Sequence, residues 1–320
     1  MSLELQSQWP HSFIGCNYTI EKHDCTTATC CVAQSSFLYV PEYWPNLFYA
    51  ILFGVFILPQ VFLGVKYKTW GYMVGMVTGL VVEVIGYVGR VLLNDNWFNN
   101  DAFLMYLIAL TIAPVFITAA IYICLTRIII MYGEHLSFFR PRTIAIAFMS
   151  SDFISLVLQA VGGAIAETAD DGSDTKQTGV DIMIAGLLLQ AISLVVFCAV
   201  WAHFHVSLRR GIPDQTPDRR RARGRKIFKL FQAGLMLATA AIIVRSVYRV
   251  VELWGGFEGE LWNNERDFII MDGAMMGLAV VLLTVLHPGF SFQGHWQTTG
   301  WNVRGSRQKG AVGGKSAEEA

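Results

Sequence analysis

The sequence predicts an all-α protein, a bundle of seven transmembrane helices with the N-terminus outside and the C-terminus in the cytosol. Hydrophobic residues make up 54% of its 320 residues and charged residues only 15%, which is too apolar for an ordinary soluble domain. Seven apolar stretches each have the length of about 20 residues that spans a bilayer. The lysines and arginines between these stretches are distributed very unevenly, and this distribution predicts the orientation.

The polar segment before the first span, residues 1–44, holds four of the six cysteines: Cys16, Cys25, Cys30 and Cys31. Cysteines gathered in this way indicate an oxidising, extracytoplasmic tail with up to two disulfides, whose pairing the sequence leaves open. Asn17 also begins an Asn-Tyr-Thr pattern, a candidate glycosylation site. Four reduced thiols are the alternative, and the spacing lacks the paired CxxC typical of a structural zinc site.

The seven apolar stretches form a predicted membrane domain, residues 45–289. In chain order they are 46–65, 72–92, 103–126, 143–166, 180–206, 227–253 and 268–287. Eighteen of the 24 lysines and arginines fall on one side of these spans and three on the other. Because basic residues favour the cytosolic side, the N-terminus is predicted outside, in agreement with the cysteines. Residues 290–320 are expected to form a cytosolic, disordered tail.

Three glycines recur at every fourth position of the second span: Gly71, Gly75 and Gly79. Small residues on one helix face let a neighbouring helix approach closely. We interpret this stripe as a packing feature.

Polar residues also occur inside the spans, where a charge costs about 2.5–3.5 kcal/mol on insertion scales. In the sixth span, the spacing of Arg245, Arg249 and Glu252 places all three on one helix face. The complete candidate set is Glu83, Tyr87, Arg90, Asp152, Gln159, Gln190, Arg245, Tyr248, Arg249, Glu252 and Asp272. We predict that these residues form a polar network inside the bundle and a candidate substrate site. A purely structural set of ion pairs is the alternative.

The charges of this set suggest specific pairs. The second span begins its motif with Glu83 and ends it with Arg90, whereas the sixth begins with Arg245 and ends with Glu252. If the two helices face each other, Glu83 pairs with Arg245 and Arg90 with Glu252. Arg249 is then left to meet Asp272 or an anionic group of a ligand. Asp152 has no cation at its depth, so we expect it to be protonated or hydrogen-bonded.

Several blocks of residues between Tyr39 and Gly289 resemble the fungal lipid-translocating exporter family, whose founding members are named for resistance to aminocholesterol. These blocks include Tyr39-Val-Pro41 with Asn46, Glu83-Val-Ile-Gly-Tyr-Val-Gly-Arg90, Leu110-Thr-Ile-Ala-Pro114, Asp152 with Ser155 and Gln159, Gly186-Leu187 with Gln190, Arg245 with Tyr248-Arg249 and Glu252, Glu265 with Asp272, and His287-Pro-Gly289. One departure is Gln60, at a position where the family often has histidine.

The resemblance implies a protein that binds and moves amphipathic membrane lipids, such as sphingoid long-chain bases or sterols, and contributes to resistance to toxic lipophilic compounds. We expect the plasma membrane as the location, with the vacuole or another endomembrane as alternatives. The amine of a sphingoid base would suit an acidic acceptor such as Asp272, Glu252 or Asp152. The sequence has no GxxxxGK[ST] motif, so ATP bound to this chain is not expected to drive transport. Neither an enzyme activity, nor a cofactor, nor a nucleic-acid partner is expected.

Two other functions are compatible with the sequence. Seven spans with an external N-terminus match a G-protein-coupled receptor or a stress sensor in topology, although span three ends in Leu-Thr-Arg127 rather than Asp-Arg-Tyr. A metal or haem site is the other alternative, with Asp152, His203, His205 and His287 as ligands. Because His203 and His205 are two residues apart on a helix, they cannot face one ion together. We therefore expect interfacial histidines and no metal.

Overall fold

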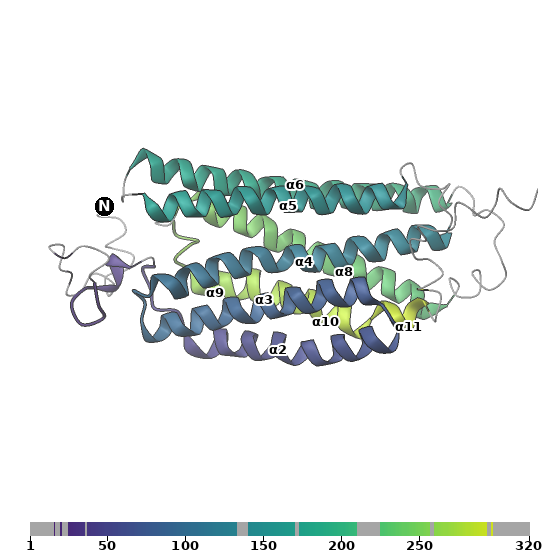
Figure 1. Ribbon diagram of the computed structural model, residues 1–320, viewed down its shortest axis with the longest axis horizontal. Helices are drawn as coiled ribbons and strands as arrows, with labels where there is room; N and C mark the ends of the chain where they lie inside the picture. The colour runs from purple at the N-terminus through teal and green to yellow at the C-terminus, as the bar shows by residue number, and fades with distance from the viewer. Residues whose placement is uncertain are drawn as a thin grey trace, which may run out of the picture.

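The computed structural model contains seven helical segments that are long and apolar enough to cross a membrane (Figure 1). The structure describes residues 16, 20, 25–35, 37–132, 140–169, 173–209, 225–256, 259–292 and 296. The first six segments are α2 (Tyr43–Lys66), α3 (Trp70–Asp95), α4 (Asn100–Tyr132), α5 (Pro141–Thr168), α6 (Asp174–Arg209) and α8 (Lys226–Trp254). The seventh consists of α9 (Glu265–Phe268), the π-helix η5 (Ile269–Ala274), α10 (Met275–Val285) and α11 (Pro288–Phe292). All seven predicted spans are confirmed.

The helices form a long bundle in which α5 and α6 pack together along one edge and α2 lies along the opposite edge (Figure 1). Helix α3 packs chiefly against α4 and α2, whereas α8 packs chiefly against α10 and α6. These neighbours determine which charged side chains can meet inside the bundle.

Glycines permit the closest helix contacts. A Cβ atom on Gly79 would lie 2.6 Å from Ile117 Cγ1 of α4, and one on Gly75 would lie 3.0 Å from the Phe116 carbonyl oxygen. The predicted close approach is therefore confirmed at these two positions, whereas Gly71 would make only an ordinary contact of 3.5 Å. Helices α5 and α6 also approach closely, since a Cβ on Gly162 would lie 2.6 Å from the Gly179 carbonyl oxygen.

The polarity of the bundle is that of a membrane protein. Large apolar side chains are exposed on its outer surface, among them Leu58 on α2 at 76% and Phe153 on α5 at 66%. Charged side chains are buried instead, among them Glu83, Arg90 and Asp272. Lipid would cover the apolar surface, and a buried side chain that keeps its charge needs a partner of opposite charge.

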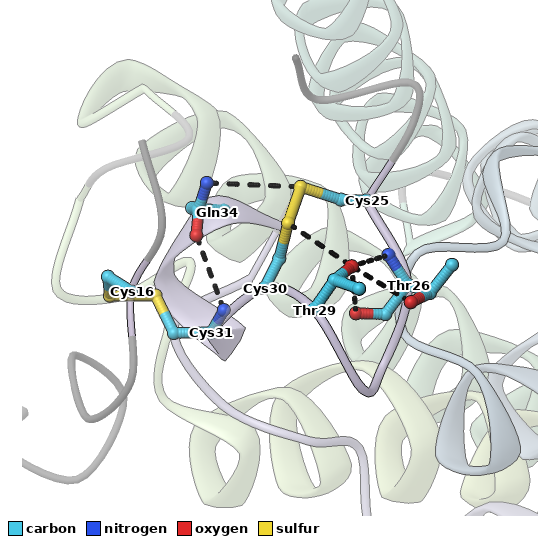
Figure 2. Close-up of a disulfide and its surroundings, with 7 residues drawn as sticks. All are labelled: Cys16, Cys25, Thr26, Thr29, Cys30, Cys31 and Gln34. Atoms are coloured by element: carbon cyan, nitrogen blue, oxygen red, sulfur yellow. Dashed lines mark hydrogen bonds between the residues drawn. A yellow bond between two sulfur atoms is a disulfide. The ribbon is translucent and has the colours of Figure 1, made fainter. Parts of the chain in front are cut away.

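The N-terminal segment is held by two disulfides, Cys16–Cys31 and Cys25–Cys30 (Figure 2). The predicted oxidation of the four cysteines is thus confirmed, and the pairing is now assigned. The short helix η3 (Val32–Gln34) follows, and Phe37 then stacks on Trp262 with ring centroids 5.7 Å apart. These contacts anchor the segment to one end of the bundle, opposite α11 (Figure 1). Asn17, the candidate glycosylation site, lies outside the described residues.

Candidate functional site

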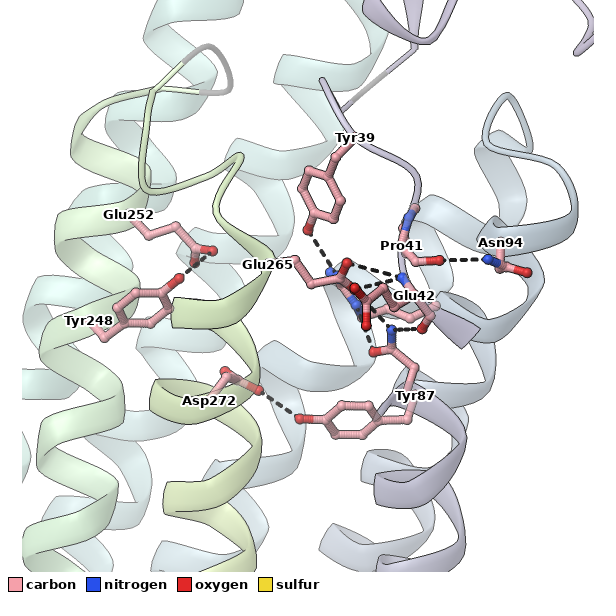
Figure 3. A network of polar contacts seen from close by, with 11 residues as sticks. Tyr39, Pro41, Glu42, Tyr87, Asn94, Tyr248, Glu252, Glu265 and Asp272 are labelled. Carbon is pink, nitrogen blue, oxygen red and sulfur yellow. Dashed lines mark hydrogen bonds and ion pairs between the residues drawn. The ribbon is translucent and has the colours of Figure 1, made fainter. Parts of the chain in front are cut away.

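The interior of the bundle holds a group of polar side chains that we call the central cluster. It comprises Glu83 and Tyr87 of α3, Arg245, Tyr248, Arg249 and Glu252 of α8, and Asp272 of η5, and all seven are buried. Helical periodicity explains why one face of α8 supplies three charges, as the sequence predicted. Figure 3 shows the Tyr248 hydroxyl pointing to Glu252 within α8 and the Tyr87 hydroxyl of α3 pointing to Asp272 of η5.

Asp272 contacts three other residues of the central cluster. Its Oδ1 lies 2.9 Å from Nε of Arg249 and 3.0 Å from Nε of Arg245. The hydroxyl of Tyr87 donates a hydrogen bond of 3.4 Å to Oδ2. One buried carboxylate therefore neutralises parts of two guanidinium groups, which ties the seventh span to α8.

The two arginines have further partners. Nη1 of Arg249 lies 2.8 Å from Oε2 of Glu252, one turn away on the same helix. Nη2 of Arg245 donates to the backbone carbonyl of Leu110 in α4. The guanidinium groups are thus shared among three elements, which fixes the position of α8 between α4 and the seventh span.

Asp272 belongs to a π-helical turn rather than a regular α-helix. Such turns are rare and are frequent at functional sites. Gly273 beside it leaves room for aromatic rings, because a Cβ at this position would lie 2.6 Å from Cε2 of Tyr49. The absence of a side chain at Gly273 therefore lets the Tyr49 ring and the Tyr87 hydroxyl approach η5 beside Asp272.

A second group, the rim cluster, lies at the end of the bundle nearest the disulfide-bonded segment. It comprises Tyr39, Glu42, Asn46, Arg90 and Glu265, and Figure 3 labels Tyr39, Glu42 and Glu265. Arg90 is its centre: Nε donates to Asn46 Oδ1 at 3.0 Å, and Nη2 donates to the Tyr39 hydroxyl at 2.9 Å. Nη2 also lies 3.3 Å from Oε1 of Glu265, which in turn accepts the Glu42 backbone N–H at 2.9 Å.

Two of the predicted ion pairs are wrong. Arg245 pairs with Asp272 instead of Glu83, and Arg90 pairs with Glu265 instead of Glu252. The physical reason is the packing order, since α8 lies against the seventh span while α3 lies against α2 and α4. The predicted contact between Arg249 and Asp272 is confirmed.

Asp152 lies in a third group, the α5 cluster, between α4, α5 and α6. Its Oδ2 accepts hydrogen bonds from the hydroxyls of Tyr122 at 2.9 Å and Thr118 at 3.1 Å. Of the two predicted states, the hydrogen-bonded one is therefore observed. Gln159 Nε2 donates to Gln190 Oε1 at 3.2 Å. The predicted residues thus do not form one network: they lie in the central cluster, in the rim cluster, around Asp152, and in a separate Gln159–Gln190 pair.

Sequence reasoning did not include several residues of these groups. Glu265 lies just before the last apolar stretch, so hydropathy assigned it to a loop, although it is one of the residues that carry the family resemblance. Tyr122 and Thr118 carry no charge and lie in an apolar helix, where hydropathy does not separate them from packing residues, although Tyr122 also carries part of the family resemblance. Their role follows only from their contact with Asp152.

The structure gives no support to the metal alternative within its described residues, which contain no group of three or more histidine, cysteine, aspartate or glutamate residues placed to hold an ion. His203 is exposed on α6. His287 is buried, and its Nδ1 accepts the backbone N–H of Gly289 at 3.0 Å.

The fold and these clusters define a class of protein: a seven-helix membrane protein whose interior carries paired carboxylates and arginines. The family model described as "RTA1 like protein" matches residues 76–295, which is more than half of the chain. The chain therefore belongs to the RTA1-like family, as the resemblance predicted.

Three relatives from Saccharomyces cerevisiae illustrate the family. The chain is 33% identical over 292 residues to the sphingoid long-chain base transporter RSB1, covering 82% of this chain and 76% of that protein. It is 28% identical over 209 residues to protoporphyrin uptake protein 1, covering 65% and 66% of the two chains. It is also 28% identical over 238 residues to protein RTM1, covering 71% and 73%. No solved structure matches the chain.

Proposed function

We propose that this protein binds amphipathic lipids that carry an amine, sphingoid long-chain bases above all, and moves them across the membrane. The observation that carries the proposal is the 33% identity, over 82% of the chain, to a transporter of these bases. The family match, residues 76–295, includes the whole central cluster. Removal of toxic amphipathic molecules from one leaflet would contribute to resistance against them.

The chemistry of the interior supports this substrate class. A long-chain base has an apolar tail, hydroxyl groups and an amine that is protonated at neutral pH. Its ammonium group requires acceptor oxygens in a region that otherwise excludes charge. Carboxylates of the central cluster and of the α5 cluster supply such oxygens inside the bundle. The apolar outer surface would accommodate the tail among the lipids.

We further propose that the N-terminus lies outside and the C-terminus in the cytosol, and that the plasma membrane is the location. In this arrangement residues 1–44 form the extracytoplasmic tail, 45–289 the membrane domain and 290–320 the cytosolic tail. The two disulfides support this orientation because they persist in oxidising compartments. The basic residues concentrated on the other side support it independently.

A transport assay with purified protein in lipid vesicles tests the function. Labelled long-chain base, sterol and porphyrin should be presented side by side, with protein-free vesicles as the control. We expect the base to cross faster than in the protein-free vesicles. Movement no faster than in those vesicles would refute the proposal. Guanine-nucleotide exchange on a co-expressed G protein, triggered by the base, would favour a receptor instead.

A further inference from the structure

Glu83 differs from the other buried acids of the bundle. Its side chain is 0% exposed, and neither carboxyl oxygen has a hydrogen-bond partner among the described residues. It lies near the middle of α3 (Trp70–Asp95), about 18–20 Å from either end of the helix at about 1.5 Å per residue. A polar group buried in this way is costly unless it binds something.

Within the central cluster, Glu83 is the carboxyl group that pairs with no arginine of the described residues. The ion pairs of the buried arginines go to three carboxylates, with Arg245 and Arg249 on Asp272, Arg249 also on Glu252, and Arg90 on Glu265. These three positive and three negative charges balance without Glu83. An ionised Glu83 would leave one negative charge in the membrane without a partner, so a cation has to accompany it.

The surroundings of Glu83 are mixed in charge. Arg245 and Arg249 of α8 and Asp272 of η5 act electrostatically on its carboxyl group, and Tyr87 lies one turn away on α3. Both arginines are already paired with Asp272, and Asp272 itself repels a second negative charge. The site therefore favours a neutral Glu83 until another cation arrives.

We propose that Glu83 is an exchangeable cation site, which holds a proton in the absence of ligand and binds the ammonium group of a sphingoid long-chain base in its place. The O–H bond of the Glu83 carboxyl breaks and the proton leaves to solvent. The carboxylate then forms an ion pair with the ammonium group, so the net charge of the site does not change. This inference rests on the proposed function. It adds the coupling ion, a proton that crosses the membrane in the direction opposite to the base.

The other acids are less suited to this exchange. Asp272 and Glu252 would have to give up arginine partners, and Asp152 already accepts two hydroxyl hydrogen bonds. Glu83 offers two acceptor oxygens without a partner among the described residues, and an ammonium group carries three donors.

Proton release on binding tests the proposal directly. The purified full chain in detergent, in a weakly buffered solution with a pH indicator, is mixed with a sphingoid base below neutral pH. We expect about one proton released per bound base, and an apparent affinity that falls about tenfold for each pH unit of acidification. Glu83→Gln should release none and lose this pH dependence, whereas Glu83→Asp should retain proton release.

Two controls make the result specific. An N-acetylated base has the same tail but no charge, and it should release no proton from the wild type. Glu265→Gln removes another acid of the bundle, one that pairs with Arg90 in the rim cluster, and should leave proton release intact. Binding of the base to the wild type without proton release, or equal release from Glu83→Gln, would overturn the inference and leave the proposed function standing.

A failure of any base to bind would contradict the proposed function instead. Infrared difference spectra between acidic and alkaline pH would then test the proton site by itself. A band of a protonated carboxyl that is present in the wild type and missing in Glu83→Gln supports the site. The same band in both proteins would overturn it.

Discussion

Asp272→Asn should destabilise the bundle strongly, because Asp272 is fully buried and its Oδ1 lies 2.9 and 3.0 Å from two arginine nitrogens. Asparagine keeps the shape of the side chain but removes its charge. Arg249 would retain Glu252, whereas Arg245 would retain only the Leu110 carbonyl. Removing one partner of a buried ion pair costs about 3–5 kcal/mol. Because two arginines share this carboxylate, we expect the loss near the upper end, about 5 kcal/mol.

The assay is equilibrium unfolding of the purified protein in mixed micelles. Glu265→Gln is the matched control, since Arg90 would keep its hydrogen bonds to Asn46 and Tyr39. A double-mutant cycle between Asp272→Asn and Arg245→Gln should give a coupling energy of about 1–3 kcal/mol. The corresponding cycle between Glu83→Gln and Arg245→Gln should give a smaller value, since these two side chains form no ion pair in the structure.

Two results would refute this reasoning. One is an Asp272→Asn protein that is no less stable than Glu265→Gln. The other is stronger coupling of Arg245 to Glu83 than to Asp272, which would restore the pair first expected from the spacing.

Three further predictions concern other parts of the chain. A membrane-impermeant thiol reagent should label the N-terminal cysteines of intact cells only after reduction; labelling before reduction contradicts the disulfides, and none after it contradicts the orientation. Asp152→Asn should cost at most about 1.5 kcal/mol of stability, because an amide oxygen can still accept from Tyr122, yet transport in vesicles should fall; full activity or absence from the membrane would contradict this. Gly162→Ala should cost about 1–3 kcal/mol of stability, since its Cβ would lie 2.6 Å from the backbone of α6. Gly163→Ala is the control and should be nearly neutral, because the nearest neighbour of its Cβ would lie at 3.7 Å. Equal melting temperatures of the two variants would contradict this.

The seven spans could be predicted because a membrane helix needs a long apolar run and the loops must be polar. The buried face of α8 could be predicted as well, because helical periodicity aligns Arg245, Arg249 and Glu252. The structure confirms that all three are buried. Both predictions depend on one helix at a time, and local sequence carries that information.

The partners of the charges depend on which helices are neighbours, and spacing within each helix does not determine this. The reversed charges of spans two and six suggested that α3 and α8 face each other, but α8 lies against the seventh span. Glu265 was missed for a related reason. It belongs to the short helix α9 that begins the last span, and its carboxylate reaches Arg90 only because α9 packs beside the start of α2.

The corrected pairing changes what Glu83 can do. In the predicted arrangement Glu83 neutralises Arg245, so an ammonium group would have to break a buried ion pair to reach the carboxylate, at a cost of about 3–5 kcal/mol. In the structure Asp272 pairs with Arg245 instead. Binding of an ammonium group at Glu83 therefore disrupts no ion pair. The arginines of α8 then hold the helices together, while the adjacent acid is left to exchange its proton. Structural ion pairs and an exchangeable site therefore coexist in one cluster, because Asp272 and Glu252 together already balance the charges of Arg245 and Arg249.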